Sequence, residues 1–392
     1  MTTYGGTKNK GVLFKYDPVH NVFEKKVDFI VSNGQEPYGS LTACSNWKLY
    51  GMTRNGGNDN YGVLFEYDPF NDTLIKKVDF ADSIGILTEG SLLEASNGKL
   101  YGMTNMGGTH DGGVLFEYNP ITSSYAKKID FTGATNGRYP EGTLIQAKNG
   151  LLYGTTAQGG IYDNGVLFEY DPVTNNLVKK IDFDGTNIGS LPYGALFQAD
   201  DGKLYGMTSY GGVYDSGVLF SYEIASGVLT KLLDYNGDST GYRPRGTLMQ
   251  AVNGKLYGTT CCGGIWSGGT LFEYDIQTNK FVKKEDFNQI NGYTPTWGQL
   301  IEIGGMVGIA PIIPPENDQG ISVYPNPSNG KFTISLKDDE SIKIYNTMGM
   351  EIYNGQYQRG ENNLVLDLPN GIYILKAWNG KASSSVKISI FN

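Results

Sequence analysis

The chain has 392 residues, a formal net charge of −9, two histidines and three cysteines. This length exceeds what one compact core usually holds, so the sequence predicts two domains. The acidic charge is spread along the chain and argues against a nucleic-acid partner. Three cysteines (Cys44, Cys261, Cys262) are too few for a disulfide framework, and two histidines exclude a histidine-rich metal site. No stretch of about 18 apolar residues predicts a transmembrane segment.

A phrase close to Gly-Val-Leu-Phe-Glu-Tyr occurs six times, about fifty residues apart. Its phenylalanines are Phe14, Phe65, Phe116, Phe168, Phe220 and Phe272. A period of this length indicates supersecondary units that stack or radiate around an axis. No long segment has an apolar stripe at helical spacing, so we expect the units to be built from strands.

Each period contains four short alternating segments separated by turn residues. Around Phe168, strands are predicted at 142–147, 151–156, 166–171 and 177–183, joined by Gly, Asn-Gly and Asp-Pro turns. The third strand has apolar residues on both faces, as expected for a sheet that packs between two neighbours. The fourth strand carries a Lys-Lys pair with an Asp two residues later. We interpret these charges as protection of an edge strand rather than as a basic binding patch.

The two ends of the repeat region complement each other. Met1 aligns with the second strand of a unit, and residues 298–303 supply a sixth copy of the first strand. Pairing of these ends would close the ring and remove its free edges. The sequence therefore predicts an all-β protein in which residues 1–310 form a six-bladed β-propeller.

The repeated wording Leu-Tyr-Gly-Met/Thr-Thr, Gly-Gly and Gly-Val-Leu-Phe resembles the GloVer-type tandem repeats, which are similar to kelch blades. The resemblance covers residues 1–303. It implies a propeller-like fold and no particular chemistry, because the repeat itself defines the family.

Binding residues on a rigid repeated scaffold are expected in the loops that vary between copies. One varying position precedes the glycine that opens each first strand. Its occupants are Tyr38, Glu89, Glu141, Tyr193, Arg245 and Trp297. We expect these side chains to ring the mouth of a central channel, where aromatic rings and charges can bind a sugar or a peptide. The alternative is that they only close the channel.

A second varying loop joins the second and third strands. Three copies place an aromatic residue there that could extend the site as an exposed rim: Tyr162, Tyr214 and Trp266. The next residue is Asn, Asp or Ser in all six copies. A calcium loop needs several converging oxygens, whereas these residues also stabilise tight turns. We therefore favour turn formation and predict neither a metal site nor a cofactor.

No catalytic motif is visible, so no catalytic residue is predicted. Glu89 and Glu141 belong to adjacent repeats, and glycosidase carboxylates work about 5–9 Å apart. Three hypotheses follow. The first is a module that binds a glycan or a protein. The second is a polysaccharide-acting enzyme with carboxylates at the channel mouth, and the third is a structural surface or adhesion protein without a pocket.

Beyond the repeats, the composition changes. Residues 311–320 are rich in proline and polar side chains, as in a stiff linker. Residues 321–392 alternate as short strands and predict a small Ig-like β-sandwich. Four motifs occur in this stretch: Tyr-Pro-Asn-Pro, Tyr-x-x-x-Gly, Gly-x-Tyr and a lysine near the end. Their residues are Tyr324, Pro325, Asn326, Pro327, Tyr345, Gly349, Gly371, Tyr373 and Lys387.

These motifs, in this order, resemble the type A C-terminal sorting domain of the type IX secretion system. The resemblance implies partners in the secretion machinery, removal of residues 321–392 by a sortase-like peptidase, and a location outside the cell or on the outer-membrane surface. Export also requires an N-terminal signal. The residues after Met1 show neither the basic nor the apolar segment of a signal peptide, so we expect a shortened chain or a start upstream of Met1.

Overall fold

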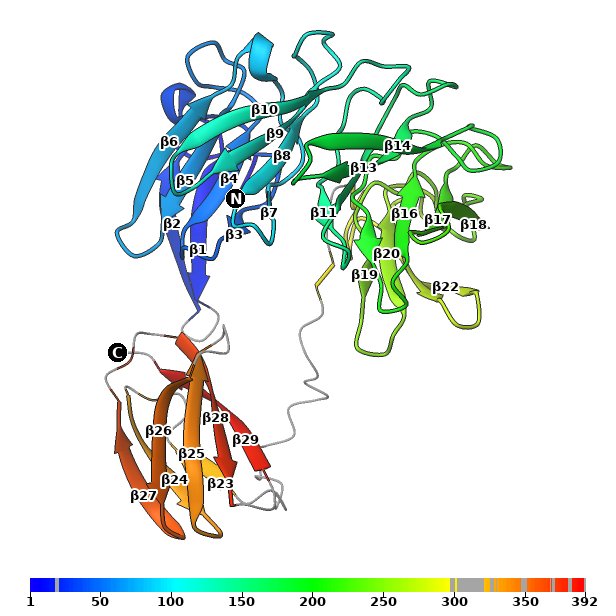
Figure 1. Ribbon diagram of the computed structural model, residues 1–392. Coiled ribbons are helices and arrows are strands. Elements are labelled where there is room, and N and C mark those ends of the chain that lie inside the picture. Colours follow the sequence, from blue (N-terminus) through cyan, green and yellow to red (C-terminus); the bar gives the residue numbers. More distant parts are fainter. Residues whose placement is uncertain are drawn as a thin grey trace. The chain divides into compact units, whose positions relative to one another are not determined.

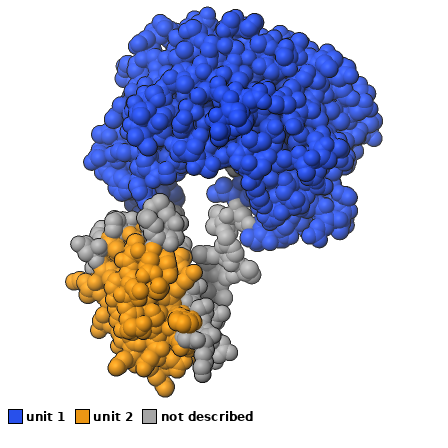
Figure 2. Space-filling view, viewed as in Figure 1, with its two compact units in different colours: residues 1–302 blue, residues 303–392 orange. Residues whose placement is uncertain are grey.

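The computed structural model divides into two compact units, residues 1–302 (unit 1) and 303–392 (unit 2) (Figures 1 and 2). It describes residues 1–17, 21–296, 300–301, 321–324, 328, 330–346, 351–366, 368, 371–379 and 383–390. These residues form β-strands and two single 3-10 turns, Val31–Asn33 and Asp82–Ile84, but no α-helix. The all-β prediction is therefore confirmed. The predicted linker, residues 311–320, lies outside the described part.

The described residues of unit 1 form one two-stranded and five four-stranded antiparallel sheets, each made of strands that follow one another in the chain (Figure 1). The first sheet consists of β1 (Val12–Asp17) and β2 (Val22–Asp28). The second consists of β3 (Thr42–Ala43), β4 (Leu49–Thr53), β5 (Val63–Asp68) and β6 (Thr73–Asp79). The third is β7 (Leu93–Glu94), β8 (Leu100–Thr104), β9 (Val114–Asn119) and β10 (Ser124–Asp130). The fourth is β11 (Ile145–Gln146), β12 (Leu152–Thr156), β13 (Val166–Asp171) and β14 (Asn176–Asp182). The fifth is β15 (Phe197–Gln198), β16 (Leu204–Thr208), β17 (Val218–Glu223) and β18 (Val228–Asp234). The sixth is β19 (Met249–Gln250), β20 (Leu256–Thr260), β21 (Thr270–Asp275) and β22 (Lys280–Asp286).

Three of the four strands predicted around Phe168 match β12, β13 and β14 to within one residue at each end. The fourth, predicted at 142–147, pairs over only two residues, β11. The predicted closing strand at 298–303 is described only at Leu300 and Ile301, which belong to no strand. Ring closure and a sixth blade therefore stay predictions.

Four of the third strands, β5, β9, β13 and β17, contribute to two cores, one on each side of their sheet. In β13, Val166 and Phe168 pack in a cluster with Tyr101 of the preceding repeat. On the other face, Leu167 packs with Phe220 of the following repeat. The prediction that both faces are covered by neighbouring sheets is confirmed for these four strands. Burial of the large aromatic and aliphatic side chains in these shared cores joins consecutive repeats.

The glycine of the Leu-Tyr-Gly phrase has a steric explanation. A Cβ atom at Gly154 would lie 2.7 Å from Cζ of Phe168 on the adjacent strand. The same contact, at 2.5–2.6 Å, occurs in four other repeats: Gly51, Gly102, Gly206 and Gly258. The repeated phenylalanine therefore occupies the space that a side chain at this glycine would need. This contact explains why the Leu-Tyr-Gly and Val-Leu-Phe phrases occur together in these repeats.

A buried threonine ends each complete second strand and holds the start of the third. Thr156 Oγ1 donates a hydrogen bond to the carbonyl oxygen of Gln158 (2.9 Å) and accepts one from the N–H of Val166 (3.2 Å). Its side chain is fully buried.

We expect Thr156→Val to lower the free energy of unfolding by about 1–3 kcal/mol, because it keeps the shape but leaves a buried N–H without a partner. Denaturant titration measures this loss. Thr156→Ser keeps the hydroxyl and is the matched control. A Thr156→Val variant as stable as the wild type, beside a destabilised Thr156→Ser, would show that the methyl group, and not the hydrogen bonds, matters at this position.

The charged fourth strands are neutralised locally. Lys179 Nζ lies 2.8 Å from an oxygen of Asp182, and Lys180 Nζ lies 3.6 Å from Glu169 on the neighbouring strand. The Lys–Asp pair occurs in all six repeats: Lys25–Asp28, Lys76–Asp79, Lys127–Asp130, Lys179–Asp182, Lys231–Asp234 and Lys283–Asp286. Each lysine of these pairs has a carboxylate partner, which supports edge protection over a basic patch.

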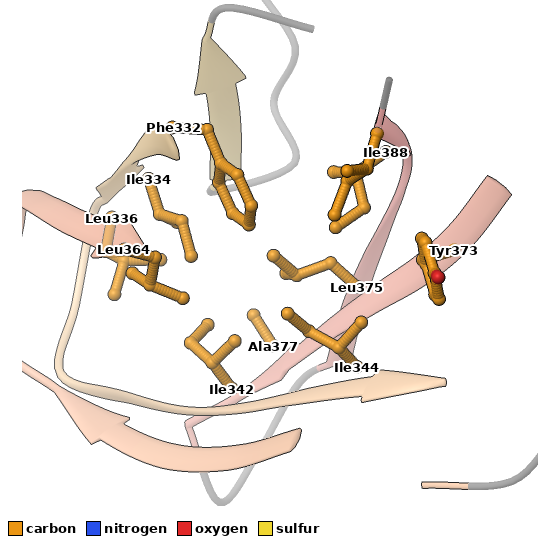
Figure 3. Packing of buried hydrophobic residues seen from close by; sticks show 11 residues of the cluster. Phe332, Ile334, Leu336, Ile342, Ile344, Leu364, Tyr373, Leu375, Ala377 and Ile388 are labelled. Atoms are coloured by element: carbon orange, nitrogen blue, oxygen red, sulfur yellow. The ribbon is translucent and has the colours of Figure 1, made fainter. Parts of the chain in front are cut away.

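In unit 2, the residues that the structure describes form two antiparallel sheets. Their strands are β23 (Ile321–Tyr324), β24 (Lys331–Leu336) and β27 (Gly360–Val365) in one sheet, and β25 (Glu340–Asn346), β26 (Glu351–Tyr357), β28 (Gly371–Trp378) and β29 (Ser383–Ile390) in the other. One core joins them: Phe332 and Ile334 from the first sheet face Ile344 and Leu375 from the second (Figure 3). Unit 2 is thus a small two-sheet domain. Its Ig-like relationship stays a prediction.

Candidate functional site

The first strands of successive repeats approach each other at their opening glycines. A Cβ atom on Gly39 would lie 2.4 Å from the carbonyl oxygen of Gly90, and one on Gly90 would lie 2.7 Å from that of Gly142. The series continues from Gly142 to Gly194 (3.0 Å) and from Gly194 to Gly246 (2.4 Å). Only glycine permits this close backbone contact. It brings the residue before each glycine next to its counterpart in the next repeat.

Five of the six predicted ring residues line one cavity of about 120 Å³: Tyr38, Glu89, Glu141, Tyr193 and Arg245. We call it the channel cavity. The sixth residue, Trp297, lies outside the described residues. Pockets that hold whole small molecules usually measure roughly 300–1,000 Å³. The channel cavity is smaller, so it can accept one end group of a larger ligand.

Two arginines place positive charge beside the cavity. Arg54 Nη2 lies 3.4 Å from Glu89 Oε1, and its guanidinium stacks 5.2 Å from the ring centre of Tyr38. The Arg245 guanidinium lies 4.8 Å from the ring centre of Tyr193. Stacking on an aromatic face holds each guanidinium in place. The site therefore combines two cation–aromatic pairs with two carboxyl groups.

Arg54 was not among the predicted residues. It directly follows the second strand, where other repeats have Asn105, Ala157, Ser209 and Cys261. This position also varies between copies, so the same comparison of repeats would have found it if applied to both loops.

The two carboxyl groups differ in their surroundings. Burial, and after it the charge of Glu89, raise the pKa of Glu141 to about 8, against the opposing charges of Arg245 and Arg54. Burial also raises the pKa of Glu89, again against the two arginines. Near neutral pH, Glu141 thus carries a proton and can donate a hydrogen bond. Glu89 is the carboxyl group that contacts Arg54.

The predicted rim residues are exposed: Tyr162 by 58%, Tyr214 by 59% and Trp266 by 61%. The residue before each is also apolar and exposed, namely Ile161, Val213 and Ile265. None of the three aromatics lines the channel cavity. Backbone bridges such as Ser190 with Tyr210 join their loops to the loops that lead into the cavity. The rim therefore lies at the same end of the sheets as the cavity, but as a separate surface.

The Asn/Asp series in these loops makes turn contacts. Asp163 Oδ1 accepts a hydrogen bond from the N–H of Gly159 (2.9 Å), and its backbone has a φ of 56°. The same contact is made by Asn9, Asn60, Asp111 and Asp215. The turn interpretation is confirmed for these residues. Among the described residues, no three metal-ligating side chains group together.

The described sorting-motif residues are spread over unit 2. The Tyr324 hydroxyl donates to Glu361 from an exposed position, and the Tyr345 ring lies 5.4 Å from Lys376 Nζ. Tyr373 is part of the core, and Gly371 begins its strand, β28. Lys387 lies in β29, opposite Ile374. The remaining four, Pro325, Asn326, Pro327 and Gly349, lie outside the described residues.

Comparison with known proteins identifies both parts of the chain. The Gloeobacter/Verrucomicrobia repeat matches residues 1–150, 87–250, 135–311 and 189–342. The secretion system C-terminal sorting domain matches residues 322–391. No curated protein matches the chain. In the described part of the chain, no helix is both long and apolar enough to cross a membrane.

Several solved structures are similar to the chain. A "putative 6-phosphogluconolactonase" from Bacteroides uniformis has a TM-score of 0.50 and 14% identity, covering 93% of this chain and 98% of that one. The periplasmic gluconolactonase PpgL of Pseudomonas aeruginosa has a TM-score of 0.49 and 13% identity, covering 93% and 98%. PorZ, a surface component of the type IX secretion system of Porphyromonas gingivalis, has a TM-score of 0.48 and 14% identity. The match covers 98% of this chain and 56% of PorZ, so the present chain spans just over half of the length of PorZ.

At these identities the likeness concerns the fold alone, and at a TM-score of 0.50 it supports a propeller-like fold. The sequence matches carry the assignment, because the repeat covers most of the chain and the sorting domain covers residues 322–391 near its end. The chain belongs to the Gloeobacter/Verrucomicrobia repeat family and ends in a type IX sorting domain, which makes it a secreted or cell-surface protein.

Proposed function

We propose that the protein is a secreted binding module whose channel cavity captures the end of a glycan or protein ligand. The observation that carries this proposal is the contrast between repeats. Their strands repeat the same residues, whereas the positions around the cavity hold different ones, Glu89, Glu141, Tyr193 and Arg245 among them. A plug that only filled space would not require two carboxyl groups, whose partial burial costs free energy.

The chemistry of the cavity favours a ligand end with several hydrogen-bonding groups. Protonated Glu141 donates, Glu89 accepts, and the two arginines add fixed donors. The tyrosine rings supply apolar faces. The exposed rim residues Tyr162, Tyr214 and Trp266 would contact the part of a larger ligand that extends beyond the cavity. We further propose that a sortase-like peptidase removes residues 321–392 during export.

The test is a glycan and protein array probed with the full chain, followed by affinity measurements on variants. We expect Arg245→Gln to weaken binding of any array hit about tenfold or more, because a buried charged hydrogen bond is lost. Lys148→Gln, in the turn between β11 and β12 at the opposite end of the sheet, is the control and should bind as the wild type does. Blank arrays would instead favour a structural surface protein.

An enzyme is the second candidate, because a protonated carboxyl group beside a second carboxyl group is the arrangement that glycoside hydrolysis uses. The double variant Glu89→Gln/Glu141→Gln separates the two functions. Polysaccharide turnover by the wild type that disappears in this variant, with binding retained, would indicate the enzyme. Binding without turnover by the wild type supports the module.

A further inference from the structure

A second cavity, of about 340 Å³, lies between two successive sheets, β15–β18 and β19–β22. We call it the inter-sheet pocket. Ser221 and Leu232 line it from the first sheet, and Tyr274 and Ile276 line it from the second. It shares no residue with the channel cavity. Its volume falls in the range of roughly 300–1,000 Å³ that is typical of small-molecule sites.

The pocket arises where one repeat departs from the others. In the next repeat, Glu273 occupies the position of Ser221 and Lys284 that of Leu232. There, Glu273 accepts a hydrogen bond from the Tyr257 hydroxyl (2.7 Å) and pairs with Lys284 (3.0 Å). The same Glu–Lys pair occurs as Glu66–Lys77, Glu117–Lys128 and Glu169–Lys180. Serine and leucine replace two long charged side chains, and this replacement leaves space.

The walls that remain are mixed in character. Leu232 and Ile276 are apolar, and the Ser221 hydroxyl lies at the position of the absent glutamate. Asp201 also lines the pocket; its Oδ2 accepts a hydrogen bond from the Tyr205 hydroxyl (2.8 Å) and its Oδ1 accepts one from the N–H of Lys203 (3.1 Å). Such a wall offers an apolar surface with hydrogen-bonding groups around it. A sugar ring has the matching shape, because its C–H face is apolar and its edge carries hydroxyl groups.

Both lysines at the pocket have carboxylate partners, which disfavours an anionic ligand. Lys231 pairs with Asp234 at 2.8 Å. Lys203 lies 3.9 Å from Glu223. Neither lysine is therefore an open cation for a phosphate or a carboxylate.

From this geometry we propose that the inter-sheet pocket binds one neutral sugar ring, at a site separate from the channel cavity. Its occupant would be a single residue of a polysaccharide or a free monosaccharide, and saturation-transfer NMR distinguishes the two by comparing methyl glycosides with short oligosaccharides. The proposal does not depend on the channel cavity being a binding site.

The test uses the full chain and the methyl glycosides of glucose, mannose and N-acetylglucosamine as probes. We expect saturation transfer to at least one of them. The double variant Ser221→Glu/Leu232→Lys restores the residues of the sister repeats, so it should fold and fill the pocket. It is expected to lose the signal, whereas Lys148→Gln, in the turn between β11 and β12 and outside both cavities, should keep it.

A second variant protects the test against misfolding of the first. Asp201→Asn copies Asn253 of the next repeat, which contacts the Tyr257 hydroxyl at 2.9 Å. It should preserve the fold and weaken binding several-fold. No transfer to any of the three glycosides, or equal binding by the wild type and both variants, would overturn the proposal.

Discussion

Deletion of residues 321–392 is expected to abolish export, so that unit 1 accumulates inside the cell envelope. The sorting domain matches residues 322–391 and forms a core of its own. The described cores of unit 1 contain no residue of unit 2. The deletion therefore removes the export signal without removing any of these packing contacts. Cell fractionation followed by immunoblotting measures the effect, and we expect an all-or-none loss from the surface and the medium.

Point variants of unit 2 test whether export requires a folded sorting domain or only the presence of its sequence. Leu375 is fully buried in the core, so Leu375→Asp places an unpaired charge there and should unfold the domain. Trp378 is 56% exposed on the same strand, and Trp378→Ala is the matched control. We expect the first variant to stay inside and the second to be exported. Normal export of the deletion variant would show that the signal lies elsewhere in the chain.

The strands of unit 1 could be predicted because each residue pattern has one dominant physical cause. Alternation and turn residues placed β12, β13 and β14 within a residue of their observed ends. The short β11 could not be foreseen, because its length depends on how closely Gly142 approaches Gly194 in the next repeat. The residue pattern within one repeat does not reveal its contacts with the next repeat.

The channel cavity could also be predicted only in part. Comparison of equivalent positions in the repeats identified five described residues that line it, among them Glu141 and Arg245. This comparison did not give the size of the cavity or the contribution of Arg54, because both depend on how side chains from different loops pack. The inter-sheet pocket could not be predicted from differences between the loops of the repeats. Its distinguishing residues, Ser221 and Leu232, lie within strands, where the repeats otherwise agree.

The variant with the second large expected effect is Glu141→Gln, which should remove a pH-dependent loss of stability. The pKa of Glu141 is about 8 in the folded protein, whereas a carboxyl group of an unfolded chain titrates near 4.3. Between these values the folded state binds more protons than the unfolded state. The stabilising contribution of the protonated group is therefore complete below about pH 4 and is lost as the pH rises to about 8.

The loss amounts to a few kcal/mol in total, on the order of magnitude that such a shift implies. Because glutamine is neutral at every pH, Glu141→Gln should match the wild type near pH 4, exceed it increasingly up to about pH 8 and keep a constant advantage above that. Urea titrations from pH 4 to 9 measure the difference. Glu141→Asp keeps a titrating carboxyl group at the same place and should retain most of the slope. If the wild type and Glu141→Gln show parallel pH profiles, Glu141 is ionised in the folded protein, and its role as a hydrogen-bond donor in the channel cavity is lost.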